Sequence, residues 1–281
     1  MQQFYSFKTN FLYLFIIFSI ATKAEITFIS WNIKDFGKSR NDEEIKAIAK
    51  HIRHADILAI QEVVAKDPGG AQAVARLADQ LNRMGAKWDY SVSDPTQSTS
   101  THKSERYAYI WKTSKLTITG GGPRLLTELS GYAEREPYFI QFKSNNKVLT
   151  IINYHACTHK DDYPERAEIN AISKWLIDKS YDNLIWAGDM NLEIDDIAFS
   201  PILKNSFRNV LNGKKTSLKK SCKNGNYLSR SEDNILYKIK DFKLKSAKVL
   251  DFIHGGPCDE VEWKWISYSN HLAVVVIFHL I

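Results

Sequence analysis

The chain has 281 residues, of which 44% are hydrophobic and 12% aromatic, and its formal net charge is +6. This content is enough to bury a sizeable core in one large domain or two small ones, which excludes a chain that stays disordered. Its three cysteines form no CxxC pair and no cysteine–histidine spacing typical of zinc, which excludes a structural zinc module as well.

Residues 1–24 have the features of a cleavable secretory signal peptide. Lys8 is the only charge before the apolar run 11–21, and Thr22-Lys23-Ala24 places small residues at the two positions that a signal peptidase reads. The run is too short to span a bilayer comfortably, which favours cleavage over anchoring. We therefore expect a secreted or periplasmic monomer, residues 25–281, which forms one domain and has no stable membrane association.

Positive charge is concentrated in the stretch from Lys204 to Lys248, where the only acids are Glu232, Asp233 and Asp241. Removing the two lysines of the signal peptide lowers the formal charge from +6 to +4, so this stretch carries much of what remains. A basic stretch in an exported protein suggests a polyanionic partner, either nucleic acid or an anionic membrane surface. The alternative is a solvated, lysine-rich loop.

Export permits a disulfide, and an odd number of cysteines leaves at least one thiol unpaired within the chain. The pairing that we favour is Cys222 with Cys258. Cys157 is expected to be a small buried residue.

Hydrophobic periodicity predicts many strands interrupted by a few helices. In chain order, we expect a strand at 26–33, a helix at 43–52 with Asp42 as its N-cap, a strand at 56–62, a helix at 71–83, strands at 88–93 and 105–111, a turn at 120–123, neighbouring strands at 138–142 and 148–155, a helix at 166–178, and strands at 184–189, 231–237 and 270–278. The hairpin-like spacing favours mostly antiparallel sheets whose outer faces are covered by helices, an α/β sandwich in layers.

The stretch Leu184–Glu193 is the most informative part of the chain. An apolar run ends in Gly188, and Asp189 and Asn191 follow at a spacing that puts both side chains on one face of an extended strand. An acid and an amide at the rim of a buried sheet suit a hard divalent cation, or a phosphate held beside one. A strand followed by an ordinary Asp/Asn turn is the alternative.

Other polar residues recur where apolar strands begin or end. They are Asn32, Glu62, Glu105, His155, Asp189, Asn191, Asp233, Asn270 and His271. Taken alone, each is more often a turn former, a surface acid or a structural histidine. Converging at one edge of a sandwich, they would form a metal-assisted hydrolytic site for a phosphate ester, with Glu62 as the best direct ligand and the histidines suited to proton transfer.

These residues carry a resemblance. The chain resembles the endonuclease/exonuclease/phosphatase superfamily, and within it the deoxyribonuclease I branch. The matching stretches are 30–33, 60–63, 103–107, 135–137, 154–156, 167–170, 188–191, 231–233 and 269–271, in the family's order over essentially the whole mature chain.

The resemblance implies a four-layer αββα sandwich of two mostly antiparallel sheets flanked by helices, with a site that hydrolyses phosphodiesters by a metal-assisted, activated water. The ion would be Mg²⁺ or Mn²⁺, and Ca²⁺ stays open. The resemblance implies that Glu62, Asn32 and Asp189 bind the metal, and that Asp189 and Asn191 orient the water and the phosphate. It also implies that Glu105 orients His155 and that Asp233 orients His271. Arg135 would contact the phosphate.

Three residues depart from the pattern of that branch. Asn270 stands where most members have an aspartate, which removes a negative charge from the site and should weaken any metal site that it supports. Val64 and Lys103 stand at or near positions where mammalian deoxyribonuclease I has an arginine and a tyrosine that touch the minor groove. Lys103 is therefore a candidate substrate contact, and lysines of 204–248 would compensate by binding phosphate without reading sequence.

We expect a secreted, divalent-metal-dependent endonuclease that cleaves DNA largely without sequence specificity. One alternative is a phosphodiesterase or phosphatase of the same fold that acts on phospholipid or inositol phosphate. Another is a catalytically impaired, nucleic-acid-binding relative. The preference for DNA or RNA stays open.

Overall fold

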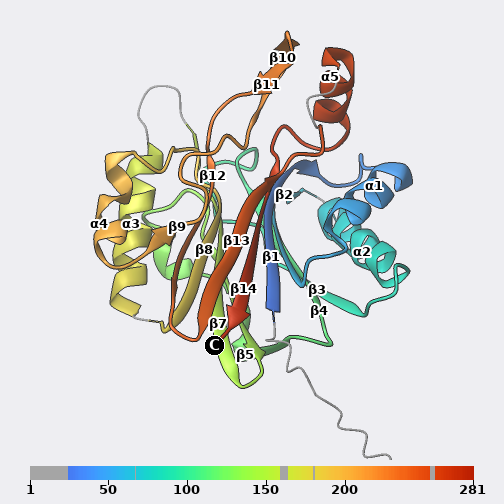
Figure 1. Ribbon diagram of the computed structural model, residues 1–281. Helices are drawn as coiled ribbons and strands as arrows, with labels where there is room; N and C mark the ends of the chain where they lie inside the picture. The colour runs from blue at the N-terminus through green and yellow to red at the C-terminus, as the bar shows by residue number, and fades with distance from the viewer. Residues whose placement is uncertain (1–24, 67, 159–163, 180, 254–256) are drawn as a thin grey trace, which may run out of the picture.

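The computed structural model describes residues 25–66, 68–158, 164–179, 181–253 and 257–281. The predicted signal peptide at residues 1–24 lies outside the described residues. Two six-stranded sheets pack face to face, and helices cover their outer faces (Figure 1). This arrangement confirms the predicted α/β sandwich.

The first sheet has the strand order β13–β14–β1–β2–β4–β3. Its strands are β13 (Phe242–Leu250), β14 (Ala273–Leu280), β1 (Glu25–Phe36), β2 (Ile57–Val64), β4 (Glu105–Lys112) and β3 (Trp88–Val92). All neighbours are antiparallel except β1 and β2.

The second sheet has the order β5–β6–β7–β8–β12–β9. Its strands are β5 (Thr117–Leu125), β6 (Tyr138–Ser144), β7 (Lys147–His155), β8 (Asn183–Asp189), β12 (Asp233–Ile239) and β9 (Arg208–Asn209). Here β7 and β8 form the parallel pair. The strands β6 and β7 pair as the predicted neighbours, and Asn145 and Asn146 adopt positive φ in the turn that joins them.

The three longest helices each bury one apolar face against the sheets. The helices are α1 (Asp42–Ile52), α2 (Gly69–Asn82), α3 (Pro164–Lys179), α4 (Ser200–Lys204) and α5 (Cys258–Ser267), with short 3-10 turns at Thr127–Leu129 and Ile197–Phe199. In Figure 1, α1 and α2 lie over the first sheet, while α3 and α4 lie over the second. No helix in the described part of the chain combines the length and the apolar character that a membrane span requires.

Three apolar clusters hold these layers together. One lies between the two sheets and includes Tyr109 and Ile185. A second joins Trp31 to the helices over the first sheet, and a third joins Trp186 to α3 and α4 over the second. The layers are therefore helix, sheet, sheet and helix.

Two local predictions were wrong. The N-cap of α1 is Asn41, one residue before the predicted Asp42, because Asn41 and Glu44 form a reciprocal capping box. The three glycines at 120–122 do not end a strand. They lie within β5, all with positive φ, where the pairing with β6 shifts register, so they form a bulge.

The correction at α1 gives a testable difference. Asn41→Ala is expected to lower the free energy of unfolding by about 1 kcal/mol, because the amide at Glu44 loses its acceptor. Asp42→Ala is expected to change it by less than about 0.5 kcal/mol, since the Asp42 carboxylate is almost fully exposed and only pairs with Arg76. Urea unfolding of both variants measures this, and an equal or reversed order would contradict the cap assignment.

A small β-hairpin extends beyond the sandwich. It consists of β10 (Leu218–Lys223) and β11 (Asn226–Leu228) and lies beside α5 at one end of the molecule (Figure 1). The disulfide Cys222–Cys258 joins β10 to α5, which confirms the predicted pairing. Cys157 is buried and lies outside this disulfide, also as predicted.

Candidate functional site

Strand ends from both sheets meet at one edge of the sandwich. In the second sheet, the register pairs His155 with Asp189 and Asp189 with Asp233, so three neighbouring strands put these side chains in one row. In the first sheet, β1 contributes Asn32, and His271 stands just before β14. Segments that are far apart in the chain thus converge on a single site.

The backbone of β2 is distorted where it reaches this edge. Glu62 has φ +59°, a left-handed conformation that is uncommon for a residue with a side chain. The pairing of β2 with β4 shifts register between Ile60 and Val63, which places Glu62 in a bulge. Such bulges re-aim a side chain next to active sites. Here the Glu62 carboxylate accepts from the Asn32 Nδ2 at 2.9 Å and from the Asp35 amide at 3.2 Å.

Each of the two histidines is held by a carboxylate. His155 Nδ1 lies 3.0 Å from both oxygens of Glu105, and His271 Nδ1 lies 2.7 Å from Asp233 Oδ2. All four side chains are buried, with exposed fractions of 3–7%. A carboxylate on Nδ1 fixes the ring and leaves Nε2 to face the site.

Asp189 lies between the two imidazoles. Its Oδ2 is 3.7 Å from His155 Nε2 and 3.4 Å from His271 Nε2, and it also accepts from Asn32 Nδ2 at 2.9 Å. Asn32 thereby bridges the carboxylates of Asp189 and Glu62. The result is a compact group of buried acids, amides and imidazoles.

This environment changes the proton affinities of the site. Burial opposes the charged forms of both histidines, yet the neighbouring carboxylates outweigh it. The Glu105 carboxylate raises the pKa of His155. The carboxylates of Asp233 and Asp189 raise the pKa of His271 to about 10. Burial also opposes ionisation of Asp189, but the two imidazoles lower its pKa. His271 therefore keeps its proton at neutral pH and can supply positive charge or a proton.

The residues fit a divalent cation that prefers oxygen ligands. Asn32 donates through Nδ2 to both acids, so its Oδ1 faces away, and this buried oxygen has no hydrogen-bond partner among the described residues. The partly exposed Glu62 carboxylate accepts from the Nδ2 of the same amide group. An amide oxygen without a partner and a carboxylate within one group of side chains are the kinds of ligand that suit Mg²⁺ or Mn²⁺.

Ligand atoms of Asp189, Asp233 and His271 also lie within 4.8 Å of one another. A metal there is less favourable, because His271 Nδ1 is engaged by Asp233 and the ring holds a proton that a metal would have to displace. The donor chemistry therefore favours the Glu62 and Asn32 side of the site.

Glu62→Gln keeps the shape of the side chain and removes its charge. We expect this change to weaken the affinity for Mn²⁺ at least tenfold, because a hard cation loses its anionic ligand. Calorimetric titration of the protein with Mn²⁺ measures the affinity without any substrate. Glu43→Gln on the exposed face of α1 is the matched control, and equal affinities in all three proteins would rule out Glu62 as a ligand.

A cleft of about 400 Å³ opens beside this group, and Glu62, His155, Arg135 and Lys103 line it. The Arg135 Nε donates to the carbonyl of Lys103 at 2.8 Å, and its Nη1 donates to that of Ala156 at 3.3 Å. Burial alone would lower the pKa of Arg135, but the Glu105 carboxylate raises it. Nη2 has no hydrogen bond to a described residue, which leaves one donor group for a phosphate.

Lys103 and Asn191, both predicted to contact the substrate, lie outside the central group of acids and histidines. Lys103 is partly exposed, with Nζ 3.3 Å from Thr99 Oγ1 and 3.7 Å from Glu134. Asn191 lies after the end of β8 with φ +50°, so it does not continue the strand beside Asp189. Its Nδ2 donates to the Ala156 carbonyl, and its backbone amide donates to Asp189 Oδ1. Asn191 thus braces the site and does not share the strand face predicted for it.

Two supporting residues lack a distinctive sequence signal. Thr216 accepts from the Asp233 amide through Oγ1 and from the Leu272 amide through its carbonyl. Ser269 donates to the Asn32 carbonyl at 2.6 Å and accepts from the His271 amide. Ser269 belongs to the matching stretch 269–271, so its place near the site could be expected. Thr216 follows two lysines, and its sequence context is that of a loop residue.

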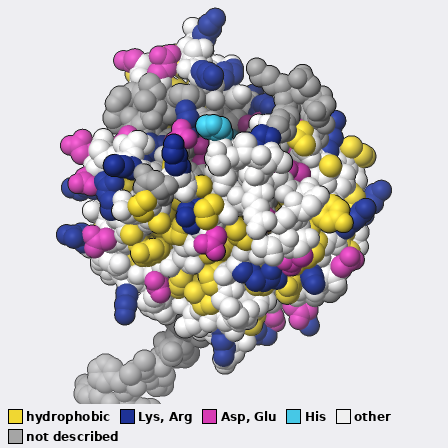
Figure 2. All heavy atoms as spheres, turned by 180° about the vertical axis from the view of Figure 1, so that it is seen from behind, with side chains coloured by type: hydrophobic (Ala, Val, Ile, Leu, Met, Phe, Trp, Pro, Cys, Tyr) yellow, Lys and Arg dark blue, Asp and Glu magenta, His cyan; other side chains and the backbone are white. Residues whose placement is uncertain are grey.

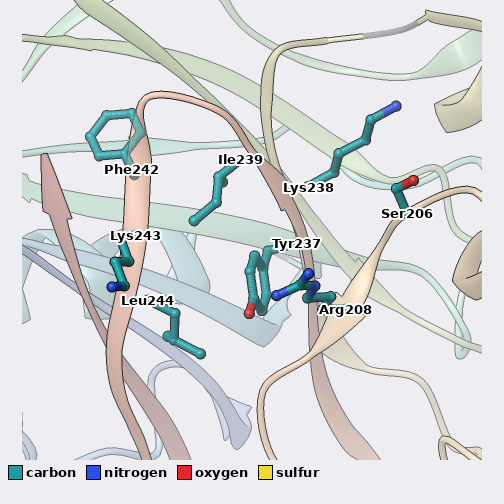
Figure 3. Close-up of a pocket in the computed structure, with 8 residues that line it drawn as sticks. All are labelled: Ser206, Arg208, Tyr237, Lys238, Ile239, Phe242, Lys243 and Leu244. Carbon is teal, nitrogen blue, oxygen red and sulfur yellow. The ribbon is translucent and has the colours of Figure 1, made fainter. Parts of the chain in front are cut away.

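A second hollow, of about 440 Å³, lies far from the histidines. It is lined by Ser206, Arg208, Tyr237, Lys238, Ile239, Phe242, Lys243 and Leu244, which come from β9, β12, β13 and the segments beside them (Figure 3). No carboxylate or histidine is among these lining residues. The hollow therefore lacks the carboxylates and imidazoles that would bind a divalent cation, and the catalytic candidate stays at the strand ends.

The fold and the site define a metal-dependent phosphoesterase of the sandwich type. The sequence profile of the Endonuclease/Exonuclease/phosphatase family matches residues 29–268. The chain therefore belongs to this family, whose members are metal-dependent phosphoesterases. The comparison with curated protein sequences finds no match.

Solved structures share the fold over nearly their whole length. An endonuclease/exonuclease/phosphatase family protein from Bacteroides thetaiotaomicron has a TM-score of 0.62 and 15% identity, covering 92% of this chain and 99% of that one. D. rerio TDP2, complexed with single strand DNA product, has a TM-score of 0.61 and 15% identity over 91% and 99%. A mannosyl-6-phosphatase of Bacteroides thetaiotaomicron has a TM-score of 0.59 and 15% identity over 90% and 99%. Identities this low show the fold alone.

Proposed function

We propose that this protein is an exported, divalent-metal-dependent endonuclease that hydrolyses DNA phosphodiester bonds with little sequence specificity. The observation that carries the proposal is the pair of carboxylate-held histidines, His155 and His271, whose Nε2 atoms face the same buried acid, Asp189. This arrangement agrees with the resemblance to the deoxyribonuclease I branch.

The geometry suits hydrolysis by an activated water. One imidazole accepts the proton of the attacking water, and the other donates a proton to the leaving oxygen. Glu105 and Asp233 keep the rings oriented, and Arg135 Nη2 binds a phosphate oxygen in the cleft. A Mg²⁺ or Mn²⁺ ion held by Glu62 and Asn32 would stabilise negative charge on the phosphate.

DNA is the favoured substrate because the chain is basic, and because Lys214 and Lys215 directly precede Thr216, whose hydroxyl accepts from the amide of Asp233. Among proteins of this fold, D. rerio TDP2 is complexed with a single strand DNA product, whereas the Bacteroides relative is a mannosyl-6-phosphatase, so the fold alone does not choose the substrate. Lysine contacts to phosphate carry no base information, which predicts non-specific cleavage.

The test is nicking of supercoiled plasmid by residues 25–281, with Mg²⁺ or Mn²⁺, with EDTA, and with a His155→Ala variant. Nicking that requires both metal and His155 supports the proposal. A folded protein that leaves DNA intact but releases phosphate or phosphocholine from a lipid or inositol substrate would replace it with the alternative phosphodiesterase or phosphatase.

Asn270 favours a second candidate, a DNA-binding relative with an impaired site. Its Oδ1 is buried and has no hydrogen-bond partner among the described residues, and the position lacks the aspartate of most members. If the protein binds DNA without cleaving it, Asn270→Asp is expected to restore nicking, because the added charge strengthens cation binding. Absence of nicking in that variant as well would exclude a nuclease disabled at this position.

A further inference from the structure

The β10–β11 hairpin begins directly at the catalytic group. The backbone of Ser217 forms a β-bridge with His271, and the Leu218 amide donates to the Asn270 carbonyl at 2.7 Å. The residue before the bridge, Thr216, accepts from the amide of Asp233. The base of the hairpin is therefore fixed to the backbone that carries His271 and its carboxylate partner.

The outer part of the hairpin is fixed as well. A two-stranded hairpin on its own is marginally stable in water. Here Tyr227 is buried in the apolar cluster that joins Trp31 to the helices over the first sheet, and its hydroxyl donates to Asp251 Oδ2 at 2.5 Å. The disulfide ties Cys222 of β10 to Cys258 at the start of α5. The hairpin is thus a positioned element that projects past the site edge (Figure 1).

Lysines dominate the hairpin and the segment that leads into it. They are Lys214, Lys215, Lys219, Lys220 and Lys223, and all are exposed or half-exposed. None forms an ion pair with a carboxylate among the described residues, and Lys219 has only a neutral partner, Asn226 Oδ1 at 3.0 Å. Figure 2 shows lysine and arginine side chains on the projection at the top of the molecule, where Figure 1 places the hairpin. The positive charge is therefore available to a partner.

We propose that this lysine hairpin, residues 214–228, binds the phosphate backbone of duplex DNA next to the scissile bond, and that the disulfide holds it there. The inference rests on the proposed function and names the element that holds the substrate. A two-stranded ribbon is narrow enough to enter the major groove, and lysines bind phosphate irrespective of sequence. Because its base adjoins His271, contact along the hairpin would guide the strand toward the histidines.

The test is equilibrium binding of a fluorescent 30-base-pair duplex in EDTA, with His155→Ala present in every protein to prevent cleavage. The lysine variant is Lys219→Ala, Lys220→Ala and Lys223→Ala together. We expect the affinity of this variant for the duplex to fall at least tenfold. We also expect the slope of log affinity against log salt concentration to become less steep by up to about 3, because each lost phosphate contact reduces that slope by roughly 0.9.

A control variant removes three exposed lysines away from the hairpin, Lys87, Lys143 and Lys174. If it loses as much affinity and slope as the hairpin variant, the effect is one of net charge and the inference falls. Thermal unfolding of each variant shows whether it is folded. Should the hairpin variant be unstable, Lys214→Ala with Lys215→Ala tests the same surface without altering the strands.

The disulfide is tested by Cys222→Ser with Cys258→Ser, in which all the lysines remain. Weaker DNA binding by the folded double variant is the expected result, and binding equal to that of the parent would overturn the positioning role. Lysine-dependent binding to vesicles containing anionic lipid, without DNA binding, would overturn the choice of partner. Plasmid nicking by the wild-type protein is measured separately, so that loss of the proposed function is distinguished from failure of the hairpin to bind DNA.

Discussion

Replacing His155 by alanine is expected to lower kcat for phosphodiester hydrolysis by about 10²–10⁴-fold, the usual contribution of a positioned acid or base. The imidazole is buried, its Nδ1 is held by both oxygens of Glu105, and its Nε2 faces Asp189 at 3.7 Å. No other described imidazole could replace it, because His271 is already engaged by Asp233. Steady-state hydrolysis of DNA with Mg²⁺ measures the effect.

A double-variant experiment shows whether Glu105 acts through His155. Glu105→Gln alone is expected to reduce kcat less than His155→Ala does, because the ring remains but loses its charged partner. The double variant should be no worse than His155→Ala, since a positioning residue has nothing left to orient. Glu134→Gln, an acid bound to Thr99 outside the histidine pair, is the control. A fully multiplicative loss would mean that Glu105 has a separate role.

Gly188→Ala is expected to produce the largest loss of stability among single substitutions at the site. A Cβ at this position would lie 1.7 Å from the carbonyl oxygen of Tyr154, and the backbone has φ +143°. Strain and overpacking each cost roughly 1–3 kcal/mol, so the free energy of unfolding should fall by about 2–6 kcal/mol. Unfolding in urea, followed by tryptophan fluorescence, measures it.

Gly131→Ala is the matched control, because a Cβ there would meet no atom within 4 Å and its φ is not in the left-handed region. It should change the free energy of unfolding by less than about 0.5 kcal/mol. A stable Gly188→Ala protein would show that β7 and β8 can separate at their site ends. The close approach of these two strands would then not be needed to place His155 beside Asp189.

Much of the fold could be predicted because apolar strands are bounded by clear polar or glycine signals. The stretch ending in Gly188 and Asp189 is such a case, and so is the strand ending at His155. The ordered motifs also indicated which polar residues would lie together, and the structure brings Asn32, Glu62, His155, Asp189 and His271 within one group. Local sequence was informative here, because His155 and Asp189 are the last residues of their strands, while Asn32 and Glu62 stand where the regular pairing of β1 and β2 ends or shifts.

Tertiary contacts decided what the sequence could not. The spacing of Asp189 and Asn191 predicted a shared face, but Asn191 leaves the strand in a left-handed turn and binds the Ala156 carbonyl. Thr216 supports Asp233 from a distant segment, and no local pattern announces such a contact. The glycines at 120–122 can adopt the positive φ angles that both a turn and a β-bulge require. Only pairing with the neighbouring strand distinguishes a bulge from a turn.

The pairing of β1 with β14 has a consequence for when the protein becomes active. These strands come from opposite ends of the described chain, with Glu25 opposite His279, and His271 stands just before β14. During synthesis, β1 emerges long before its partner exists, so a nascent chain holds Asn32 without His271. Contacts of such long range form slowly and late in folding. If the chain is exported unfolded, in line with the proposed function, the site would be assembled only beyond the membrane that the chain crosses.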